Sequence, residues 1–498
     1  MKHCTGILTL ILTLLISIPS FSASPKREFR GAWLHIVGNS TMQEMTQDAI
    51  QAWLIGTLDT LQASGCNAVF FQVRPCADAF YPSEIEPWTK YLTGTQGKAP
   101  DPFWDPLQFM IDNCHERGME LHAWLNPYRV ATSTKDVLDK NHVYHKNRSV
   151  FKTYGGQIYF DPAEPFSREH IVKVVSDIVS RYDVDGIHFD DYFYPYPVSG
   201  KDFPDNDSFR KYAQSQGFSA KQKGDWRRHN VTMMIEEVGK AVKEIKPWVR
   251  FGVSPFGIHR NIGETPDGSR TNGLSGYSQL YADVPLWAEK GYIDYMAPQL
   301  YWKIGHKLAD YEILINWWND LDSKGHLYIG QSIETFKEPD LQNPKTNQMA
   351  RKMELVRTLD NVDGNIWWPG WSIADNVDSI RDSLHVFQRD KALIPAYTDI
   401  DSEAPESVEA WASNVSGKIR WITNPTDDPM QKPHFYVVYR FCDDEDADIS
   451  DPSHILMLTR QTSFTPDPAP DGHRYSYIVT AVDRCWNESE PSETIVIK

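Results

Sequence analysis

The chain has 498 residues, of which 41% are hydrophobic and 12% aromatic, and it carries 17 Trp and 23 Tyr. This length predicts two or three domains, and the composition allows a large core and excludes overall disorder. A formal net charge of −17 argues against nucleic acid or an anionic membrane as the main partner, because both repel a negatively charged protein.

The N-terminal residues have the order of a secretory signal peptide. Lys2 precedes an apolar run over residues 7–18, and small residues follow it. The run is too short to span a bilayer comfortably. We therefore expect residues 1–23 to be a signal peptide that is cleaved near Ser22 to Ser24. The mature protein is then secreted or resides in the periplasm or cell envelope, with no membrane span.

Between residues 27 and 390, short apolar runs alternate with amphipathic segments. Strands are expected at 29–36, 68–74, 121–126, within 182–195, and at 249–254, 295–301, 327–331 and 365–368. Helices are expected at 46–64, 104–117, 167–182, 226–245, 286–290, 311–323, 348–359 and 377–387. Eight such units predict an α/β fold, the (β/α)8 TIM barrel. The alternative is a doubly wound sheet, but no glycine-rich phosphate loop follows the first strand.

The connections between these elements are uneven in length. Long ones follow the second, third, fourth and fifth strands, at residues 75–103, 127–166, 193–225 and 255–284. Barrel enzymes build their active sites from the loops that follow strands. The asymmetry therefore predicts a substrate cleft on that rim.

The composition changes after the barrel. Residues 391–405 form a predicted linker, and residues 406–498 contain strand-like runs at 408–412, 417–421, 434–439, 455–459 and 475–482. We expect an all-β sandwich there. In Tyr436-Val437-Val438-Tyr439-Arg440 and Tyr477-Ile478-Val479-Thr480-Ala481-Val482-Asp483 this region resembles the fibronectin type III fold. It holds no catalytic constellation, so a spacer or weak carbohydrate contact is the role that it supports.

Five cysteines remain after the predicted signal peptide: Cys66, Cys76, Cys114, Cys442 and Cys485. Their odd number and wide spacing support neither a zinc site nor a complete disulfide framework. A disulfide between Cys442 and Cys485 is conceivable, although the pattern favours two free thiols.

The fourth strand ends in an acidic and aromatic stretch. Its alternation places Ile187 and Phe189 on one face and His188, Asp190 and Tyr192 on the other. The same phasing of the second, third and sixth strands leaves polar residues on the inner face near their ends. We therefore expect one pocket to be formed by Arg74, Asn126, Asp190, Gln299 and Tyr301.

A carboxylate among amides and aromatic rings suits the cleavage of glycosidic bonds. Carboxylates stabilise an oxocarbenium-like transition state and move protons, while Trp and Tyr rings stack on sugars. The tryptophans near predicted strand ends or in the following loops are Trp88, Trp104, Trp124, Trp302, Trp367, Trp368 and Trp371. We expect no more than half of them to contact a ligand.

Seven motifs follow one another along the predicted barrel. They are Arg30-Gly31-Ala32-Trp33, Phe71-Gln72-Val73-Arg74-Pro75 with Asp78-Ala79-Phe80-Tyr81, Pro87-Trp88, His122-Ala123-Trp124-Leu125-Asn126-Pro127-Tyr128-Arg129, Asp185-Gly186-Ile187-His188-Phe189-Asp190-Asp191-Tyr192, Ser254-Pro255-Phe256-Gly257 and Pro298-Gln299-Leu300-Tyr301-Trp302. In these motifs the chain resembles the bacterial glycosyl-hydrolase-like ten family. The resemblance implies a glycosidase of amino-sugar polymers, in particular of peptidoglycan glycan strands that lack stem peptides.

We assign candidate roles to residues of these motifs. The candidate substrate-binding residues are Arg74, Asn126, Tyr128, Arg129, His188, Tyr192, Gln299, Tyr301 and Trp302. Arg74 and Arg129 could bind a substrate carboxylate, such as the lactyl group of muramic acid, or could be ordinary salt-bridge partners.

The candidate catalytic residues are Asp190, Asp191 and Asp78. Asp190 is our first candidate for the nucleophile or for the carboxylate that stabilises the transition state. Neighbouring residues of a strand face opposite sides, so Asp191 enters the pocket only if the strand ends before it, and otherwise caps the following loop, which the alternation favours. The partner acid then comes from Asp78, Glu264 or Glu334, with Asp78 ranked first because Arg74 lies near it. An ion pair with an arginine is the alternative role for Asp78.

The fourth strand is also similar to the family-eighteen chitinase signature DGxDxDxE. His188 and Tyr192 replace the middle acid and the terminal glutamate of that signature. Because the glutamate is the chitinase proton donor, its mechanism does not transfer to this chain. The alternative role that the similarity offers Asp190 is to orient an N-acetyl group.

Two other functions remain open on the sequence. One is a carbohydrate-binding barrel with an incomplete catalytic pair, and the other is a polysaccharide deacetylase, which would need a metal ion. His35, His122 and His188 come from different strands with no carboxylate at ligand spacing, so we expect no metal or other cofactor. The expected partner is a polysaccharide.

Overall fold

Eight parallel strands close into a barrel, which confirms the predicted (β/α)8 fold. The computed structural model describes residues 24–336, 348–413, 417–442, 445–467 and 474–497. The barrel strands pair in the order β1-β11-β10-β9-β8-β7-β3-β2. In chain order they are β1 (Phe29–Leu34), β2 (Ala68–Arg74), β3 (Glu120–Leu125), β7 (Gly186–Phe189), β8 (Arg250–Val253), β9 (Tyr295–Met296), β10 (His326–Ser332) and β11 (Val362–Trp368).

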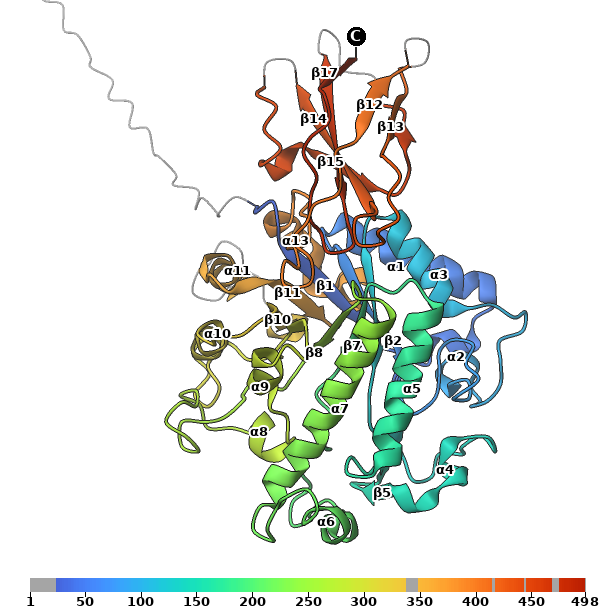
Figure 1. Ribbon diagram of the computed structural model, residues 1–498, viewed down its shortest axis with the longest axis vertical. Coiled ribbons are helices and arrows are strands. Elements are labelled where there is room, and N and C mark those ends of the chain that lie inside the picture. The colour runs from blue at the N-terminus through green and yellow to red at the C-terminus, as the bar shows by residue number, and fades with distance from the viewer. Residues whose placement is uncertain (1–23, 337–347, 414–416, 443–444, 468–473, 498) are drawn as a thin grey trace, which may run out of the picture.

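A ring of helices surrounds the barrel (Figure 1). The main helix after each strand is, in order, α1 (Gln47–Ala63), α3 (Pro106–Glu116), α5 (Pro165–Arg181), α7 (Lys223–Ile245), α9 (Val284–Glu289), α10 (Tyr311–Asn319), α11 (Gln348–Thr358) and α13 (Ile380–Phe387). Local signals set where they begin. Asp105 accepts hydrogen bonds from the N–H groups of Leu107 and Gln108, and Pro106 takes the first position of α3.

Strand alternation separates two apolar layers, as the sequence predicts. Val69, Phe71 and Val73 of β2 pack toward the helices, while Phe70 packs inside the barrel. One predicted strand is much shorter than expected, because β9 ends at Met296 and Pro298 has no N–H to continue the ladder. Beyond the end of β9, isolated β-bridges pair Gln299 with Phe256 and with Gly330, so the chain keeps an extended course between its two neighbouring strands.

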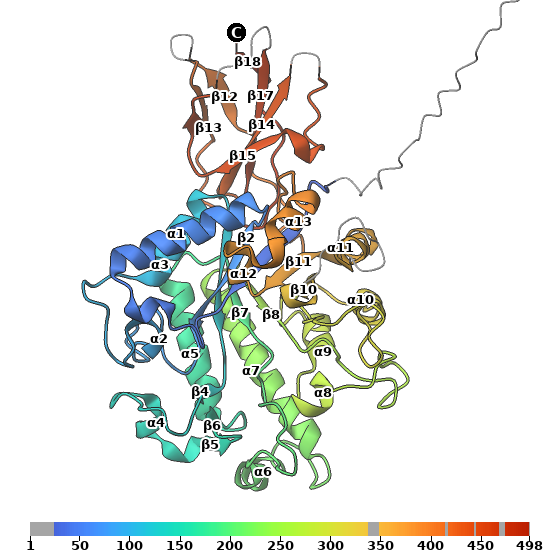
Figure 2. The same ribbon diagram turned by 180° about the vertical axis from the view of Figure 1, so that it is seen from behind.

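The long loops after the strands hold small elements of their own. They are α2 (Lys90–Thr93), β4 (Arg129–Ala131), α4 (Val143–Lys146), β5 (Phe151–Tyr154), β6 (Gln157–Phe160), α6 (Asn206–Tyr212), α8 (Gly276–Gln279) and α12 (Trp371–Ala374). The strands β4, β6 and β5 form a separate antiparallel sheet. Figures 1 and 2 show α4, α6 and β5 at the end of the molecule farthest from the C-terminal domain.

The C-terminal region forms an all-β domain of two sheets. One sheet contains β12 (Glu409–Ala412), β13 (Ile419–Ile422) and β16 (Ser463–Phe464), and the other contains β15 (Ile455–Thr459), β14 (Phe435–Cys442), β17 (Tyr475–Val482) and β18 (Ile495–Ile497). An apolar cluster that includes Val408, Trp421 and Val479 draws residues from both sheets. This arrangement agrees with the predicted sandwich, and its likeness to fibronectin type III remains a prediction.

The sandwich packs against the end of the barrel where the strands begin. His434 contacts Asp185 just before β7, and Trp486 contacts Glu120 at the start of β3. Leu393 and Ile394 of the predicted linker are buried in the same apolar cluster as Phe435 and Trp486. The segment 391–405 is therefore packed between the two parts of the molecule along some of its length.

The described residues bear on the predictions for the cysteines and for a membrane span, but not on the one for the signal peptide. Cys66, Cys76, Cys114, Cys442 and Cys485 are free thiols. The predicted signal peptide, 1–23, lies outside the described residues. None of the helices in the described part of the chain has the length and apolar character needed to cross a membrane.

Candidate active site

A cavity of about 400 Å³ opens at the end of the barrel opposite the sandwich. It is lined by residues from the C-terminal ends of the strands and from the loops that follow them. The lining residues are Trp33, His35, Val37, Gln72, Trp124, Arg129, Asp190, Asp191, Tyr192, Tyr196, Ser254, Gln299, Tyr301 and Trp368. A carboxyl pair, an arginine and many aromatic rings thus share one site.

Asp190 sits in a nest of N–H donors directly after β7. The Nδ2 of Asn126 donates to both of its carboxylate oxygens, at 3.0 and 3.1 Å, and the Nε1 of Trp124 donates to Oδ2 at 3.2 Å. Burial raises the pKa of Asp190, while the charge of Arg129 and the bond from Asn126 oppose that rise. The donors therefore favour a carboxylate at this position.

Asp191 faces the same cavity, which corrects the expectation that it caps the following loop. Strand β7 ends at Phe189, so the alternation of a regular strand does not extend to Asp190 and Asp191. The hydroxyl of Tyr196 donates to Oδ2 of Asp191. Burial and the adjacent charge of Asp190 raise the pKa of Asp191 to about 7.

The two carboxyl groups thus have different environments. Asp190 accepts several N–H bonds, whereas Asp191 accepts a hydroxyl and lies beside another negative charge. Two close carboxyl groups disfavour double ionisation, and the group with fewer donors keeps its proton. Asp191 is the better proton donor near neutral pH, and Asp190 is the better carboxylate.

Arg129 brings a positive charge to the cavity wall. Its Nε donates to the carbonyl of Pro75 at 3.0 Å, and its guanidinium lies 5.2 Å from the centre of the Tyr192 ring. These contacts hold the side chain beside Asp190. A guanidinium held in this way can stabilise the Asp190 carboxylate or an anionic group on a substrate.

Aromatic rings form much of the remaining wall. Trp368 packs 6.0 Å from Trp124 and 4.7 Å from His35, measured between ring centres. Tyr192 lies 5.4 Å from Tyr196. Flat rings of this kind suit the faces of sugar rings.

Two predicted binding residues act beneath the cavity. Asn126 does not line the cavity but donates to Asp190 and accepts a hydrogen bond from the N–H of Arg129. His188 is fully buried under the lining and binds Trp33 and Ser254. Of the predicted binding residues, Arg129, Tyr192, Gln299 and Tyr301 line the cavity itself.

Arg74 does not reach the cavity, although its predicted phase would place it there. The register between β2 and β3 shifts between Gln72 and Arg74, and such a bulge re-aims the side chain that follows it. Arg74 instead makes a two-point ion pair with Glu86, at 2.7 and 2.8 Å. Of the two roles predicted for Arg74, substrate binding or an ordinary salt bridge, the structure shows the salt bridge.

The other expected contributors also lie away from the cavity lining. Asp78 accepts bonds from the Cys76 N–H and the Gln96 side chain, and burial raises its pKa to about 7. Tyr128 is buried, and Trp302 packs against Phe256. Glu264 and Glu334 are also absent from the lining, so Asp190 and Asp191 are the carboxyl groups that line this cavity among the described residues.

Sequence reasoning did not assign several of the lining residues. They are Trp33, His35, Val37, Gln72, Tyr196 and Ser254, while Trp124 and Trp368 belong to the tryptophans predicted near strand ends. Strand phasing could have identified Gln72, because it lies on the inner face of its strand. Tyr196 had no such signal, since it follows β7 in a loop whose course is not periodic.

One group among the described residues has the composition of a metal site. The ligand atoms of His115, Asp185 and His434 lie within 4.8 Å of one another, at the sandwich end of the barrel. Arg460 places its guanidinium 2.9 Å from Nδ1 of His434, and a second cation there would be repelled. The carboxylate of Asp185 instead accepts bonds from both histidines.

Comparison with known proteins agrees with the architecture. The sequence profile described as glycosyl hydrolase-like 10 matches residues 28–348. The chain belongs to this family. It is 36% identical to the glycosyl hydrolase YngK of Bacillus subtilis over 97% of this chain and 96% of that protein. It is 39% identical to the glycosyl hydrolase DigH of Escherichia coli K12 over 69% of this chain and 81% of that protein.

Among solved structures, the catalytic domain of a β-amylase from Paenibacillus polymyxa aligns with this chain. It has a TM-score of 0.47 and 10% identity, over 73% of this chain and 98% of that one. The family match confirms the resemblance drawn from the motifs. This member of the glycosyl hydrolase-like 10 family is therefore a glycoside hydrolase-like TIM barrel protein, and the family implies a glycan as its substrate.

Proposed function

We propose that this protein is a secreted glycoside hydrolase that cleaves glycosidic bonds in an amino-sugar polysaccharide. Peptidoglycan glycan strands without stem peptides are the substrate that we favour. The observation that carries the proposal is the pair of Asp190 and Asp191 at one cavity, where burial raises the pKa of both groups and the charge of Asp190 helps to raise that of Asp191 to about 7.

Asp191 is the general acid in this proposal. It gives its proton to the glycosidic oxygen while the bond from that oxygen to the anomeric carbon breaks. The positive charge that develops on the sugar ring faces the carboxylate of Asp190, which Asn126 and Trp124 hold in place. Water then adds to the anomeric carbon and returns a proton to Asp191, which leaves a new reducing end.

The walls of the cavity support an amino-sugar substrate that carries a carboxylate. Rings such as Tyr192 and Trp368 offer surfaces for sugar stacking, and Gln299 offers an amide for hydroxyl or N-acetyl groups. Arg129 is placed to bind an acidic substituent such as a lactyl group. The relatives bear the name glycosyl hydrolase, which agrees with this assignment.

The test measures new reducing ends on glycan strands from which an amidase has removed the stem peptides. We expect wild type to release them, and Asp191→Asn and Asp190→Asn each to lower the rate by at least about 100-fold, as expected for lost acid or charge stabilisation. Asp78→Asn is the matched control and should retain activity, because Asp78 does not line the cavity. Tight binding of these strands by wild type with no new ends would favour the carbohydrate-binding alternative.

A further inference from the structure

A chain of buried hydrogen bonds runs through the barrel from the sandwich to the cavity. Nε2 of His188 lies 3.1 Å from the indole Nε1 of Trp33 and 2.9 Å from the hydroxyl of Ser254, two residues that line the cavity. Nδ1 of His188 lies 3.1 Å from the hydroxyl of Tyr295, and the same hydroxyl lies 3.0 Å from Nδ1 of His122.

The chain continues to a carboxylate at the floor of the barrel. Nε2 of His122 lies 2.9 Å from Oε2 of Glu120, and all of these side chains are buried. Oε1 of Glu120 accepts bonds from Nη2 of Arg250 and from Nε1 of Trp486, which belongs to the sandwich. We call the five residues Trp486, Glu120, His122, Tyr295 and His188 the axial relay.

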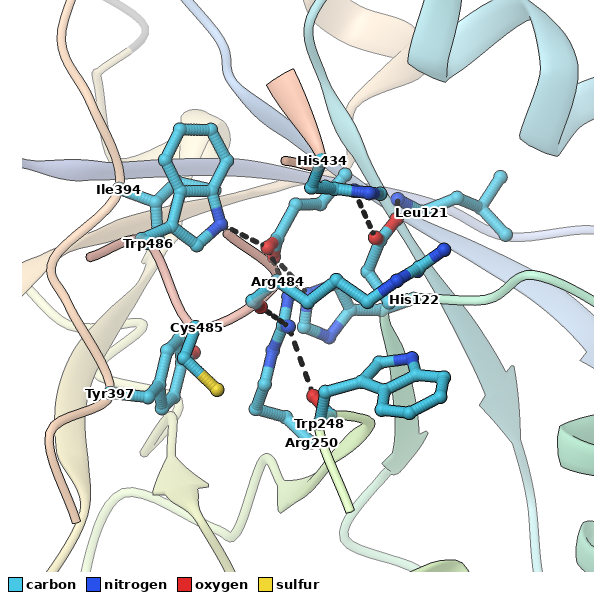
Figure 3. Close-up of polar contacts among 12 residues, drawn as sticks. Leu121, His122, Trp248, Arg250, Ile394, Tyr397, His434, Arg484, Cys485 and Trp486 are labelled. Atoms are coloured by element: carbon cyan, nitrogen blue, oxygen red, sulfur yellow. Dashed lines mark hydrogen bonds and ion pairs between the residues drawn. The ribbon is translucent and has the colours of Figure 1, made fainter. Parts of the chain in front are cut away.

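The sandwich also holds the cation beside Glu120. Nη1 of Arg250 donates to the carbonyl of Arg484 at 2.7 Å and to that of Trp248 at 3.2 Å. Figure 3 shows Trp486, Cys485 and Arg484 grouped around Arg250, with His122 close behind it. The end of the relay is thus closed by the C-terminal domain rather than by solvent.

The direction of every proton in the relay follows from its two ends. The indole of Trp33 can only donate, so Nε2 of His188 must be an acceptor. Burial lowers the pKa of His188, so its ring is neutral and its single proton sits on Nδ1. Nδ1–H then donates to the oxygen of Tyr295.

The remaining protons are then determined in turn. Nδ1 of His122 is the acceptor that lies within reach of the Tyr295 hydroxyl, so the ring proton of His122 sits on Nε2. That N–H donates to Glu120, a carboxylate that Arg250 and Trp486 keep in place. A reversal at either end would set two donors, or two acceptors, against each other at a buried contact.

We propose that the sandwich is a working part of the active site and that the axial relay is its means of action. Trp486 is a positioning residue. Through Glu120, His122, Tyr295 and His188 it orders the indole of Trp33 and the hydroxyl of Ser254 at the base of the cavity. This role goes beyond the proposed hydrolysis, since it concerns any glycan that occupies the cavity.

The first test measures which ring nitrogen of His122 and of His188 carries the proton, without any substrate. Nitrogen-15 NMR of histidine-labelled full-length protein should show His188 protonated on Nδ1 and His122 protonated on Nε2. Tyr295→Phe should shift the nitrogen resonances of both His188 and His122, because it removes the acceptor of the first ring and the donor to the second. Tyr397→Phe is the matched control, since Tyr397 is equally buried near the same interface but its hydroxyl bonds to Tyr328.

A second pair of variants tests the contribution of the sandwich. Trp486→Phe removes the donor to Glu120 and should shift the nitrogen resonances of His122 and His188. Trp411→Phe changes an exposed tryptophan of the same domain, 42% of whose surface is accessible, and should leave both resonances in place. Because neither measurement uses a glycan, a failure of the proposed hydrolysis would not affect them.

The last arm uses denuded peptidoglycan strands as the probe. Tyr295→Phe and Trp486→Phe should weaken their binding or lower kcat/KM by about ten-fold, a change of about 1.4 kcal/mol. Tyr397→Phe and Trp411→Phe should stay within about two-fold of wild type, less than the effect of one net hydrogen bond. The proposal is overturned if wild-type His188 carries its proton on Nε2, or if the relay variants and their controls behave alike.

Discussion

At the scale of single residues, the site depends on how two neighbouring acids differ. Asp190 and Asp191 are adjacent in the chain and both are buried, yet one accepts several N–H donors and the other a tyrosine hydroxyl. The charge of Asp190 itself raises the pKa of Asp191. A proton donor and a carboxylate are thereby produced from two identical side chains.

The pH dependence of hydrolysis tests this division. Asp191 must be protonated to act as the acid, so activity should fall as the pH rises through its pKa of about 7. The bond from Tyr196 favours the carboxylate form and lowers that pKa. Tyr196→Phe should therefore move the alkaline limb of the kcat/KM profile upward, by about one pH unit.

Tyr192→Phe serves as the comparison for this experiment. Tyr192 lines the same cavity, but the hydroxyl that donates to Asp191 is that of Tyr196, so the Tyr192 variant should leave the alkaline limb where it is. A downward shift in Tyr196→Phe would contradict the assignment of Asp191 as the acid.

At the scale of strands, small residues make room for the rings of the relay. A Cβ added to Gly186 would lie 2.3 Å from the ring of His122, and one added to Gly252 would lie 2.3 Å from the ring of Tyr295. These glycines pair with the same residues across neighbouring strands. The glycines in β7 and β8 thus leave space for large side chains of neighbouring strands inside the barrel.

Two glycine substitutions separate packing from backbone effects. Gly252→Ala should lower the free energy of unfolding by about 1–3 kcal/mol, because the added methyl overpacks the Tyr295 ring. Gly56→Ala, in the exposed part of α1 with no atom near the new methyl, should instead raise it by about 0.5–1 kcal/mol. Urea denaturation measures both, and equal signs would contradict the packing argument.

At the scale of the whole molecule, the barrel and the sandwich share one interface that is both apolar and polar. Phe435 and Trp486 of the sandwich pack with Leu393 and Ile394 of the connecting segment and with rings inside the barrel such as Phe29. The same interface contains the bonds of Glu120 and Asp185. Such an interface predicts that the two domains unfold together.

Thermal unfolding of the full chain should therefore show a single cooperative transition. Trp486→Ala should lower the stability of that transition by about 3–5 kcal/mol, since a fully buried indole is removed. Trp411→Ala, an exposed position of the same domain, should change it by less than about 0.5 kcal/mol. Two separate transitions in the wild-type protein would contradict this view of the interface.

Most of the barrel could be predicted because its signals are local. Alternation along β2, β3 and β7 determines which side chains face inward, and capping residues such as Asp105 mark helix starts. The prediction failed where a strand becomes irregular. The bulge before Arg74 and the end of β7 before Asp190 both change the direction of a side chain. Neither irregularity can be recognised from the hydrophobic periodicity of the sequence.

The sequence by itself determined the eight strand–helix units, the separate all-β domain, and the acidic end of the fourth strand as the centre of the site. These features depend on hydrophobic periodicity and residue type, which are local properties of the sequence. The tertiary structure alone decided that Asp191 joins Asp190 at the cavity, that Arg74 and Asp78 do not, and that the sandwich closes the opposite end. Each depends on which groups meet across distant segments, where burial and neighbouring charges set orientation and protonation.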